Sequence, residues 1–207
     1  TVNPTPTVAV SSATVCRGTA ANLTASGATT YSWNTGATTA SISVTPTTTT
    51  NYTVTGTSTG CTNTRTLSVT VNATPTVAAT SKTVCLGAAA TLTASGASSY
   101  AWNTGATTSS ISVTPTITTN YTVVGTNTLG CSNTRTLAVT VNPLPIGAST
   151  SATFSAGATA TITASGASTY SWNTGATTAN LTASPASNTN YTVTGTSAAG
   201  CVRTTTA

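Results

Sequence analysis

The sequence Tyr-Ser-Trp-Asn-Thr-Gly-Ala-Thr-Thr at residues 31–39 returns almost unchanged at residues 100–108 and 170–178. The segment Asn-Tyr-Thr-Val-Thr-Gly-Thr at residues 51–57 returns in the same way, at residues 120–126 and 190–196. Successive tryptophans of the first motif are 69 and 70 residues apart. Self-similarity at a fixed period is typical of tandem repeats, so the sequence predicts three copies of one unit of about 70 residues.

Proline-containing joints mark the borders of these units. In each case proline follows a Val-Asn pair, and it removes a backbone donor there and stiffens the connection. The predicted domains are 1–3 (the end of a preceding repeat's last strand), 4–72 (repeat 1), 73–142 (repeat 2) and 143–207 (repeat 3, with an incomplete last strand). Two arrangements fit this pattern: the chain is a window on a longer covalent array, which we favour, or the N-terminal strand of one copy completes the last repeat of another.

On both sides of the tryptophan motif, apolar residues alternate with hydroxyl residues along the sequence. Residues 41–44, 52–55 and 66–71 each have period two, which is typical of a strand with one buried and one exposed face. Leu23, the Tyr31/Trp33 pair and the Val8/Val10 pair indicate three more short strands. Six or seven short strands in about 70 residues, separated by Gly and Pro, predict an all-β chain of three tandem immunoglobulin-like β-sandwich repeats.

The aromatic residues admit a structural and a ligand-binding interpretation. Each tryptophan lies two residues after a tyrosine, on the same strand face, in the strand where such sandwiches bury a tryptophan. We therefore expect a structural core rather than an exposed sugar platform, and expect a second set of tyrosines to form tyrosine corners. The predicted core residues are Trp33, Trp102, Trp172, Tyr52, Tyr121 and Tyr191.

The cysteine count is odd, and two pairings are open. Pairing within repeats joins Cys16 to Cys61 and Cys85 to Cys131, and leaves Cys201 opposite Ser155. Pairing between successive repeats joins Cys16 to Cys131 and Cys85 to Cys201, and leaves Cys61 alone. Local loop closure favours the first, which we expect, whereas the first and last hairpins of a sandwich lie at opposite ends, which favours the second. Either pairing indicates an oxidising, extracellular compartment.

Composition excludes most catalytic chemistry. The 207 residues contain no Asp, Glu or His and only five Lys or Arg, while 60 are threonine and 25 are serine. General acid–base catalysis, hydroxyl activation and most metal sites need carboxylate, imidazole or clustered thiol groups. We therefore expect no enzyme activity, no catalytic residues, no metal and no cofactor.

Charge and hydropathy argue against nucleic-acid binding and against a membrane-spanning helix. The net charge of +5 arises from missing acids, and its five cations are scattered rather than clustered, so we expect no nucleic-acid binding. No apolar run approaches the roughly 20 residues of a membrane-spanning helix. The expected surface is nearly neutral and rich in hydroxyl groups.

Taken together, these motifs resemble the immunoglobulin-like and PKD-like repeats of large Bacteroidota surface proteins. The matching elements are Cys-x-Gly, Leu-Thr-Ala-Ser-Gly-Ala, Tyr-x-Trp-Asn-Thr-Gly-Ala-Thr-Thr, Asn-Tyr-Thr-Val-x-Gly-Thr and Gly-Cys, and they cover essentially the whole chain. Gliding adhesins and other type IX-secreted proteins carry such arrays. The resemblance implies a cell-surface filament or adhesin whose repeats act as spacers or adhesive modules.

The expected function is thus a structural segment of an extracellular surface filament or adhesin, which self-associates into a fibre or belongs to a longer array. The alternative is a carbohydrate- or surface-binding adhesin module that uses loops around Asn34 and Trp33. Serine and threonine density also predicts O-linked glycans, at no particular site.

Overall fold

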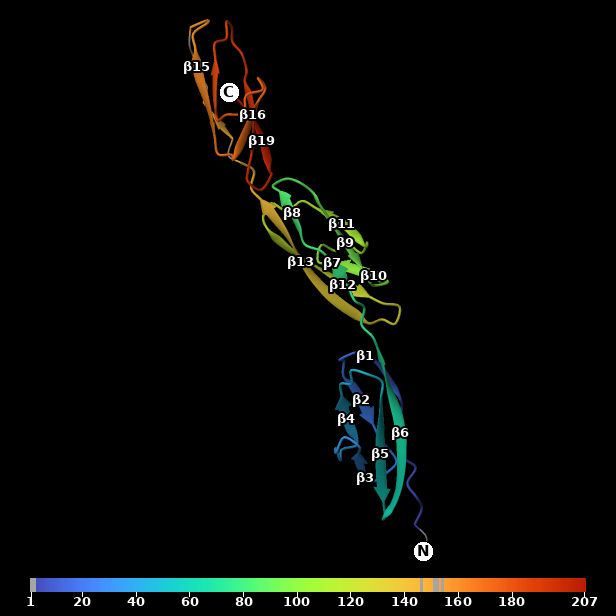
Figure 1. Ribbon diagram of the computed structural model, residues 1–207. Helices are drawn as coiled ribbons and strands as arrows, with labels where there is room; N and C mark the ends of the chain where they lie inside the picture. The colour runs from blue at the N-terminus through green and yellow to red at the C-terminus, as the bar shows by residue number, and fades with distance from the viewer. Residues whose placement is uncertain (1–2, 146, 151–152, 154) are drawn as a thin grey trace. The chain divides into compact units, whose positions relative to one another are not determined.

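The computed structural model describes residues 3–145, 147–150, 153 and 155–207, and every regular element in them is a β-strand (Figure 1). By backbone packing the chain divides into two compact units. The first contains Thr1–Ala78, Ala94–Ser109 and Val123–Arg135, and the second contains Ala79–Thr93, Ser110–Thr122 and Thr136–Ala207. These units do not follow the three sequence repeats, so the borders at 72/73 and 142/143 remain a prediction.

Repeat 1 forms a two-layered β-sandwich. One layer has the strand order β1-β6-β5-β3, and the other pairs β2 with β4. β1 runs parallel to β6, with Cys16 opposite Asn72, whereas the other pairs are antiparallel. The strands are β1 (Ala13–Cys16), β2 (Ala21–Thr24), β3 (Thr30–Trp33), β4 (Ser41–Val44), β5 (Thr50–Ser58) and β6 (Cys61–Asn72).

The alternating sequence pattern places the core between these layers. In β5, Tyr52 and Val54 are buried while the threonines between and beside them are partly exposed. In β6, Leu67 and Val69 are buried in the same way. Successive side chains of a strand point to opposite faces, so each strand contributes one apolar row to the core. The buried cluster consists of Val8, Ala21, Leu23, Ala25, Trp33, Tyr52, Val54, Leu67 and Val69.

Repeat 2 repeats this arrangement. Its layers have the orders β10-β12-β13-β8 and β11-β9-β7, and β8 is parallel to β13 with Cys85 opposite Asn142. The strands are β7 (Ala78–Ala79), β8 (Lys82–Cys85), β9 (Ala90–Ser95), β10 (Ser99–Trp102), β11 (Ser110–Val113), β12 (Thr119–Thr126) and β13 (Ser132–Asn142).

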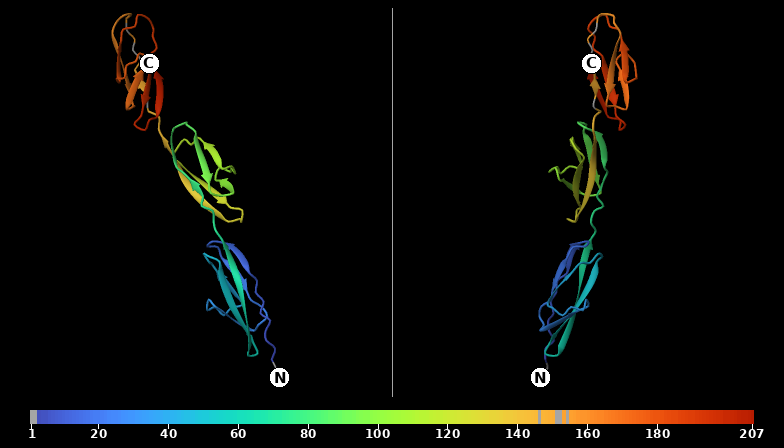
Figure 2. Two further views of the ribbon diagram at one scale, coloured as in Figure 1. Left: turned by 45° about the vertical axis from the view of Figure 1, so that its right-hand side comes forward. Right: turned by 90° about the vertical axis from the view of Figure 1, so that its left-hand side faces the viewer.

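Repeat 3 has the layer orders β16-β18-β19 and β14-β15-β17, and Figure 2 shows its strands from two sides. Its β18 is five residues long, where β5 has nine. The described residues between β14 and β15 include no strand equivalent to β1 or β8. The strands are β14 (Ala148–Ser149), β15 (Ala160–Ser165), β16 (Thr169–Trp172), β17 (Asn180–Ala183), β18 (Thr192–Thr196) and β19 (Val202–Thr206).

The strand expected at Val8 and Val10 does not form as a regular strand. Around Val8 and Val10 the backbone makes only an isolated bridge, between Ala9 and Ser26. Val8 is nevertheless buried, at 3% exposure, because the segment lies against the core. The regular strand follows at Ala13–Cys16, where a partner is available at the end of β6.

Candidate functional site

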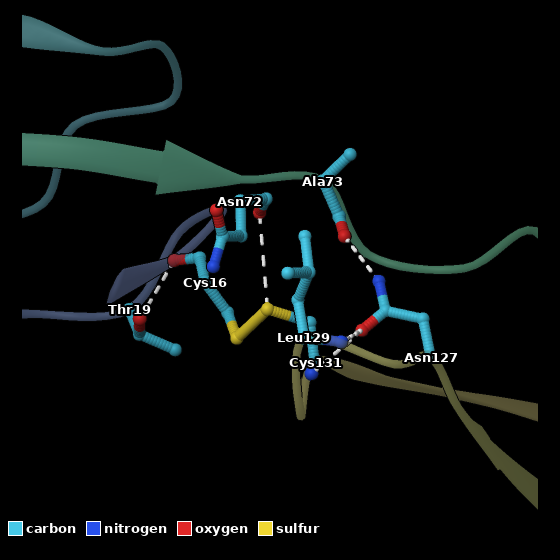
Figure 3. The surroundings of a disulfide bond; sticks show 7 residues. All are labelled: Cys16, Thr19, Asn72, Ala73, Asn127, Leu129 and Cys131. Atoms are coloured by element: carbon cyan, nitrogen blue, oxygen red, sulfur yellow. Dashed lines mark hydrogen bonds between the residues drawn. A yellow bond between two sulfur atoms is a disulfide. The ribbon is translucent and has the colours of Figure 1, made fainter. Parts of the chain in front are cut away.

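The joint between repeats 1 and 2 is closed by a disulfide bond between Cys16 and Cys131, whose Cα atoms are 5.5 Å apart (Figure 3). Cys16 ends β1 and is held there by its parallel pairing with Asn72, the last residue of β6. Cys131 follows the turn that connects β12 to β13, and it is fully buried. The bond therefore fastens a hairpin of repeat 2 to the end of repeat 1.

Hydrogen bonds hold the connecting segment against the same hairpin. The Nδ2 of Asn127 donates to the carbonyl of Ala73 at 2.8 Å, and the Nδ2 of Asn133 donates to the carbonyl of Pro75 at 3.0 Å. The Oδ1 of Asn127 accepts from the backbone N–H of Leu129 and of Cys131, both at 3.0 Å. One asparagine thus shapes the turn and binds the linker at once (Figure 3).

The joint between repeats 2 and 3 has the same plan. Cys85 is bonded to Cys201, with a Cα–Cα distance of 5.6 Å. Cys85 lies opposite Asn142, whose carbonyl accepts the N–H of Leu86 at 2.9 Å. Ser197 replaces asparagine in the turn, and its hydroxyl accepts the N–H of Cys201 at 3.1 Å. The two joints thus share the disulfide and the turn before the buried cysteine, whereas Arg203 stands where Asn133 binds the linker at the first joint.

The pairing expected from the sequence, Cys16 with Cys61 and Cys85 with Cys131, is therefore wrong. Cys16 lies beside Asn72 at the end of β6, whereas Cys61 is the first residue of that strand. Eleven residues of extended strand separate these positions by roughly 37 Å. A disulfide needs Cα atoms within about 7 Å, so the length of β6 rules out a bond within the repeat.

Cys61 is the free cysteine and is partly exposed. The N-terminal segment lies on its hairpin as the linker lies on the hairpin of repeat 2. The Nδ2 of Asn3 donates to the carbonyl of Thr59 at 2.9 Å, and the Sγ of Cys61 lies 3.5 Å from the carbonyl oxygen of Asn3. The Nδ2 of Asn63 donates to the carbonyl of Pro6 at 2.9 Å, as Asn133 does to Pro75.

The sequence reasoning did not identify the asparagines of these joints. Asn63 and Asn133 each begin an Asn-Thr-Arg-Thr segment two residues after a Gly-Cys pair. That recurrence at a fixed distance from the cysteine is the signal that could have found them.

Each tryptophan of the repeated motif is buried and hydrogen-bonded. Trp33, Trp102 and Trp172 are 3–4% exposed. In each repeat the indole N–H donates to the carbonyl six residues later, at 2.9 Å. A ring in this position is not available to stack on a sugar.

The two sets of tyrosines have different roles. Tyr52, Tyr121 and Tyr191 are 8–9% exposed and line the cores. The hydroxyl contact with a backbone N–H a few residues upstream, which we expected of them as tyrosine corners, is made by another residue. It is the hydroxyl of Tyr31 that accepts the N–H of Ala28, at 3.0 Å, and the contact recurs in the other two repeats.

Asn34 in the turn after the tryptophan strand has a structural role. Its Oδ1 accepts the N–H of Thr53 at 3.1 Å, and its Nδ2 donates to the carbonyl of Asn51 at 3.4 Å. Asn173 makes the same contacts in repeat 3. The side chain that a carbohydrate site would need is thus bound to the neighbouring strand.

The part of the chain that the structure describes contains no helix long and apolar enough to cross a membrane. Within the same residues no group of three or more metal-ligating side chains comes together.

Among solved structures, the chain is similar to tandem immunoglobulin domains. The N-terminal eight Ig domains of Down syndrome cell adhesion molecule match 98% of this chain at 16% identity, with a TM-score of 0.43. This chain spans 42% of that one. A three-Ig fragment of titin matches 99% of the chain and 98% of its own length at 10% identity, with a TM-score of 0.39.

SGBP-B of a mixed-linkage glucan utilization locus of Bacteroides ovatus, solved in complex with a mixed-linkage heptasaccharide, matches 99% of this chain and 69% of its own at 18% identity, with a TM-score of 0.27. No family model matches the sequence, and no curated protein does. These likenesses are distant, and the assignment of immunoglobulin-like sandwiches rests on the strands described above.

Proposed function

We propose that the chain is a structural segment of an extracellular surface filament or adhesin, in which disulfide-linked repeats act as spacers and support fibre formation. The observation that carries the proposal is the pair of joints at Cys16–Cys131 and Cys85–Cys201. Each joint adds a covalent bond between successive repeats, and at the first joint Asn127 and Asn133 also donate hydrogen bonds to the linker carbonyls of Ala73 and Pro75. Such reinforcement is expected of a chain that has to hold its repeats together under load.

The proposed location follows from the same bonds. Disulfides persist in oxidising compartments outside the cytosol. Sandwiches of about 70 residues bury little core, so cross-links contribute a large share of their stability. The resemblance of the motifs to Bacteroidota surface repeats supports a cell-surface origin of this kind.

The proposal includes no catalytic role. The sequence has no carboxylate or imidazole side chain, and its one lysine, Lys82, is exposed on β8. Threonine hydroxyls in β5 and β6 bond to each other across the strands, as Thr53 does with Thr66 at 3.1 Å and Thr55 with Thr64 at 3.0 Å. These groups support the sheet rather than an activated nucleophile, which requires an adjacent base.

Self-association is proposed because the surface has few charges to oppose it. Only five of the 207 residues are charged, and mutual repulsion keeps many proteins apart in solution. Electron microscopy of the purified chain at rising concentration, with light scattering in parallel, tests this. We expect fibres or large oligomers. A monomer at every concentration would contradict fibre formation.

O-linked glycans on the exposed threonines and serines are part of the same proposal. Mass spectrometry of the chain isolated from its native source would detect them as added hexose or related sugar masses. An intact mass equal to that of the unmodified chain would contradict O-glycosylation, but it would not affect the proposed structural role.

A further inference from the structure

Large apolar side chains are exposed at only a few places in the residues that the structure describes. They are Leu86, Ile117, Leu129 and Val202, which are 40%, 73%, 62% and 56% exposed. A single exposed apolar residue is normal for a soluble protein, but apolar residues that gather on the surface mark interaction sites. Leu86 and Ile117 do gather, because both line one shallow groove of repeat 2.

This groove has a volume of about 240 Å³, and the described residues that line it carry no charge. Its backbone is held in place on both sides. The N–H of Leu86 donates to the carbonyl of Asn142 at 2.9 Å, and the N–H of Val141 donates to the hydroxyl of Thr118 at 3.1 Å. The groove is therefore formed before a partner binds, which lowers the entropy cost of binding. The residues that line this surface, called here the Leu86 groove, are Leu86, Thr116, Ile117, Thr118, Val141 and Pro143.

Leu129 lies in the turn that connects β12 to β13 (Figure 3). Its N–H donates to the Oδ1 of Asn127 at 3.0 Å, and two residues later Cys131 is bonded to Cys16. The turn is thus fixed at both ends, while the leucine side chain remains exposed. A rigid turn presents this side chain to a partner at little entropy cost.

Repeat 2 differs from its neighbours at these positions. The residues equivalent to Leu86, Ile117 and Leu129 are polar or small in the other two repeats. They are Arg17, Thr48 and Thr59 in repeat 1, and Ala156, Ser187 and Ala199 in repeat 3. The shared fold therefore does not require an apolar residue at any of the three positions, so the apolar side chains of repeat 2 are available for an interaction.

We propose that the Leu86 groove binds the Leu129 side chain of a second copy of this chain. Within one copy, Leu129 does not reach the groove, because it precedes β13 while Val141 lies near the end of that strand. The extended strand from Ser132 to Val141 separates the two by roughly 30 Å. The contact therefore joins two copies.

The contact uses a different surface on each partner, so it is heterologous. A copy that gives its leucine to one neighbour still has its own groove free for the next. Heterologous contacts generate rings or open filaments, depending on whether the rotation between neighbours closes. The inference rests on the self-association proposed above, and it names the surfaces that carry it.

A second copy is the occupant that the chemistry favours. The groove and the leucine both lack charge, and both belong to the repeat that departs from the other two. Burial of the leucine contributes through the hydrophobic effect. Stable complexes bury about 1,200–2,000 Å², and one side chain in a shallow groove buries much less. A single contact is therefore weak and forms at high protein concentration.

The first experiment measures self-association of the full chain by sedimentation velocity over a range of concentrations. Leu129→Thr and Ile117→Thr give the turn and the groove the residues that repeat 1 has there. Each should weaken association by roughly tenfold or more, as expected for a large aliphatic side chain that is no longer buried. Val202→Thr is the matched control, because this exposed residue lies outside the groove and the turn, and it should leave association unchanged.

The second experiment mixes the two variants. Leu129→Thr keeps the groove and Ile117→Thr keeps the leucine. Each variant alone should stay monomeric at concentrations where their equimolar mixture forms dimers. The dimers should not grow further, because the two surfaces that remain are the altered ones. Circular dichroism spectra equal to that of the unchanged chain show that both variants are folded.

Two outcomes would overturn the proposal. In the first, both variants associate as strongly as the unchanged chain, which leaves fibre formation intact and shows that other surfaces carry it. In the second, the mixture is no more associated than its two components. Dimers in the mixture without fibres of the unchanged chain would support the contact and contradict fibre formation, so the two proposals can fail independently.

Discussion

Repeats 1 and 3 share their central motif and differ at one end of the sandwich. In both, the tryptophan is 3% exposed and its indole N–H donates to a carbonyl at 2.9 Å. In repeat 1, β1 pairs with the end of β6 and its last residue, Cys16, is bonded to Cys131, whereas Ser155 occupies the equivalent position of repeat 3. The contacts of the tryptophan therefore form from local sequence, while the end of the sandwich depends on pairing between β1 and a strand more than 50 residues away. The predictions below use this difference.

The largest effect is expected from removing the tryptophan. Trp33→Ala and Trp172→Ala should each cost about 3–5 kcal/mol, because a large buried ring leaves a cavity. Repeat 1 has β1 fastened by the Cys16–Cys131 bond and should remain folded, whereas repeat 3 has Ser155 in place of that cysteine and should unfold. Hydrogen exchange with mass spectrometry, read separately for each repeat, measures this. If both repeats respond alike, the serine at position 155 does not weaken repeat 3.

Loss of a joint disulfide comes next. Cys131→Ser should lower the free energy of unfolding by about 2–4 kcal/mol, because the bond constrains a long loop of the unfolded chain. Cys61→Ser is the matched control at the equivalent position of repeat 1, where there is no bond, and should change stability by less than about 0.5 kcal/mol. Urea denaturation followed by circular dichroism compares them. Equal midpoints would show that the bond contributes no stability.

A smaller contrast is expected at two equivalent glycines. A Cβ on Gly56 would lie 2.5 Å from the Val8 side chain and 2.7 Å from the Cβ of Ala28. Among the described residues, a Cβ on Gly195 would meet the Cβ of Ala167 at 2.8 Å and no valine side chain, because Gly147 replaces the valine. Overpacking costs about 1–3 kcal/mol, so Gly56→Ala should fall near the upper end and Gly195→Ala near the lower end. Amide exchange within each repeat measures the loss of stability caused by each substitution. A larger loss for Gly195→Ala than for Gly56→Ala would contradict this packing.

The smallest effect should come from the turn asparagines. Asn34→Ala and Asn173→Ala each remove hydrogen bonds from the side chain to the next strand and should cost about 1 kcal/mol. The contact is longer in repeat 3, 3.3 Å against 3.1 Å, so the cost there should be slightly smaller. Denaturation midpoints measure the change. A glycan-binding defect without any loss of stability would instead favour a carbohydrate site.

Sequence alternation was sufficient to predict most strands. Residues 41–44, 52–55 and 66–71 all lie in strands, because one face of each must be buried. The parallel strand at Ala13–Cys16 was missed since its pattern is short and its partner lies more than 50 residues away. Periodicity reports which face is buried, but it does not report which strands are neighbours.

The cysteine pairing illustrates the same limit. Repeat spacing placed each cysteine on an equivalent hairpin, yet it could not decide which hairpins meet. The decisive quantity is the length of β6, which places Cys16 and Cys61 at opposite ends of one repeat. The linker asparagines were missed for a related reason, since their partners are backbone carbonyls, which any sequence can provide.

The two disulfides also limit how far a pulling force can lengthen the chain. The loops they close, residues 16–131 and 85–201, overlap. A force applied to the two termini passes from Cys16 to Cys131 and from Cys85 to Cys201 through sulfur. Even with every strand unravelled, the shortest covalent path contains roughly a third of the backbone, at about 3.4 Å per residue. Reducing agents would release the remaining length, so extensibility under tension depends on redox conditions.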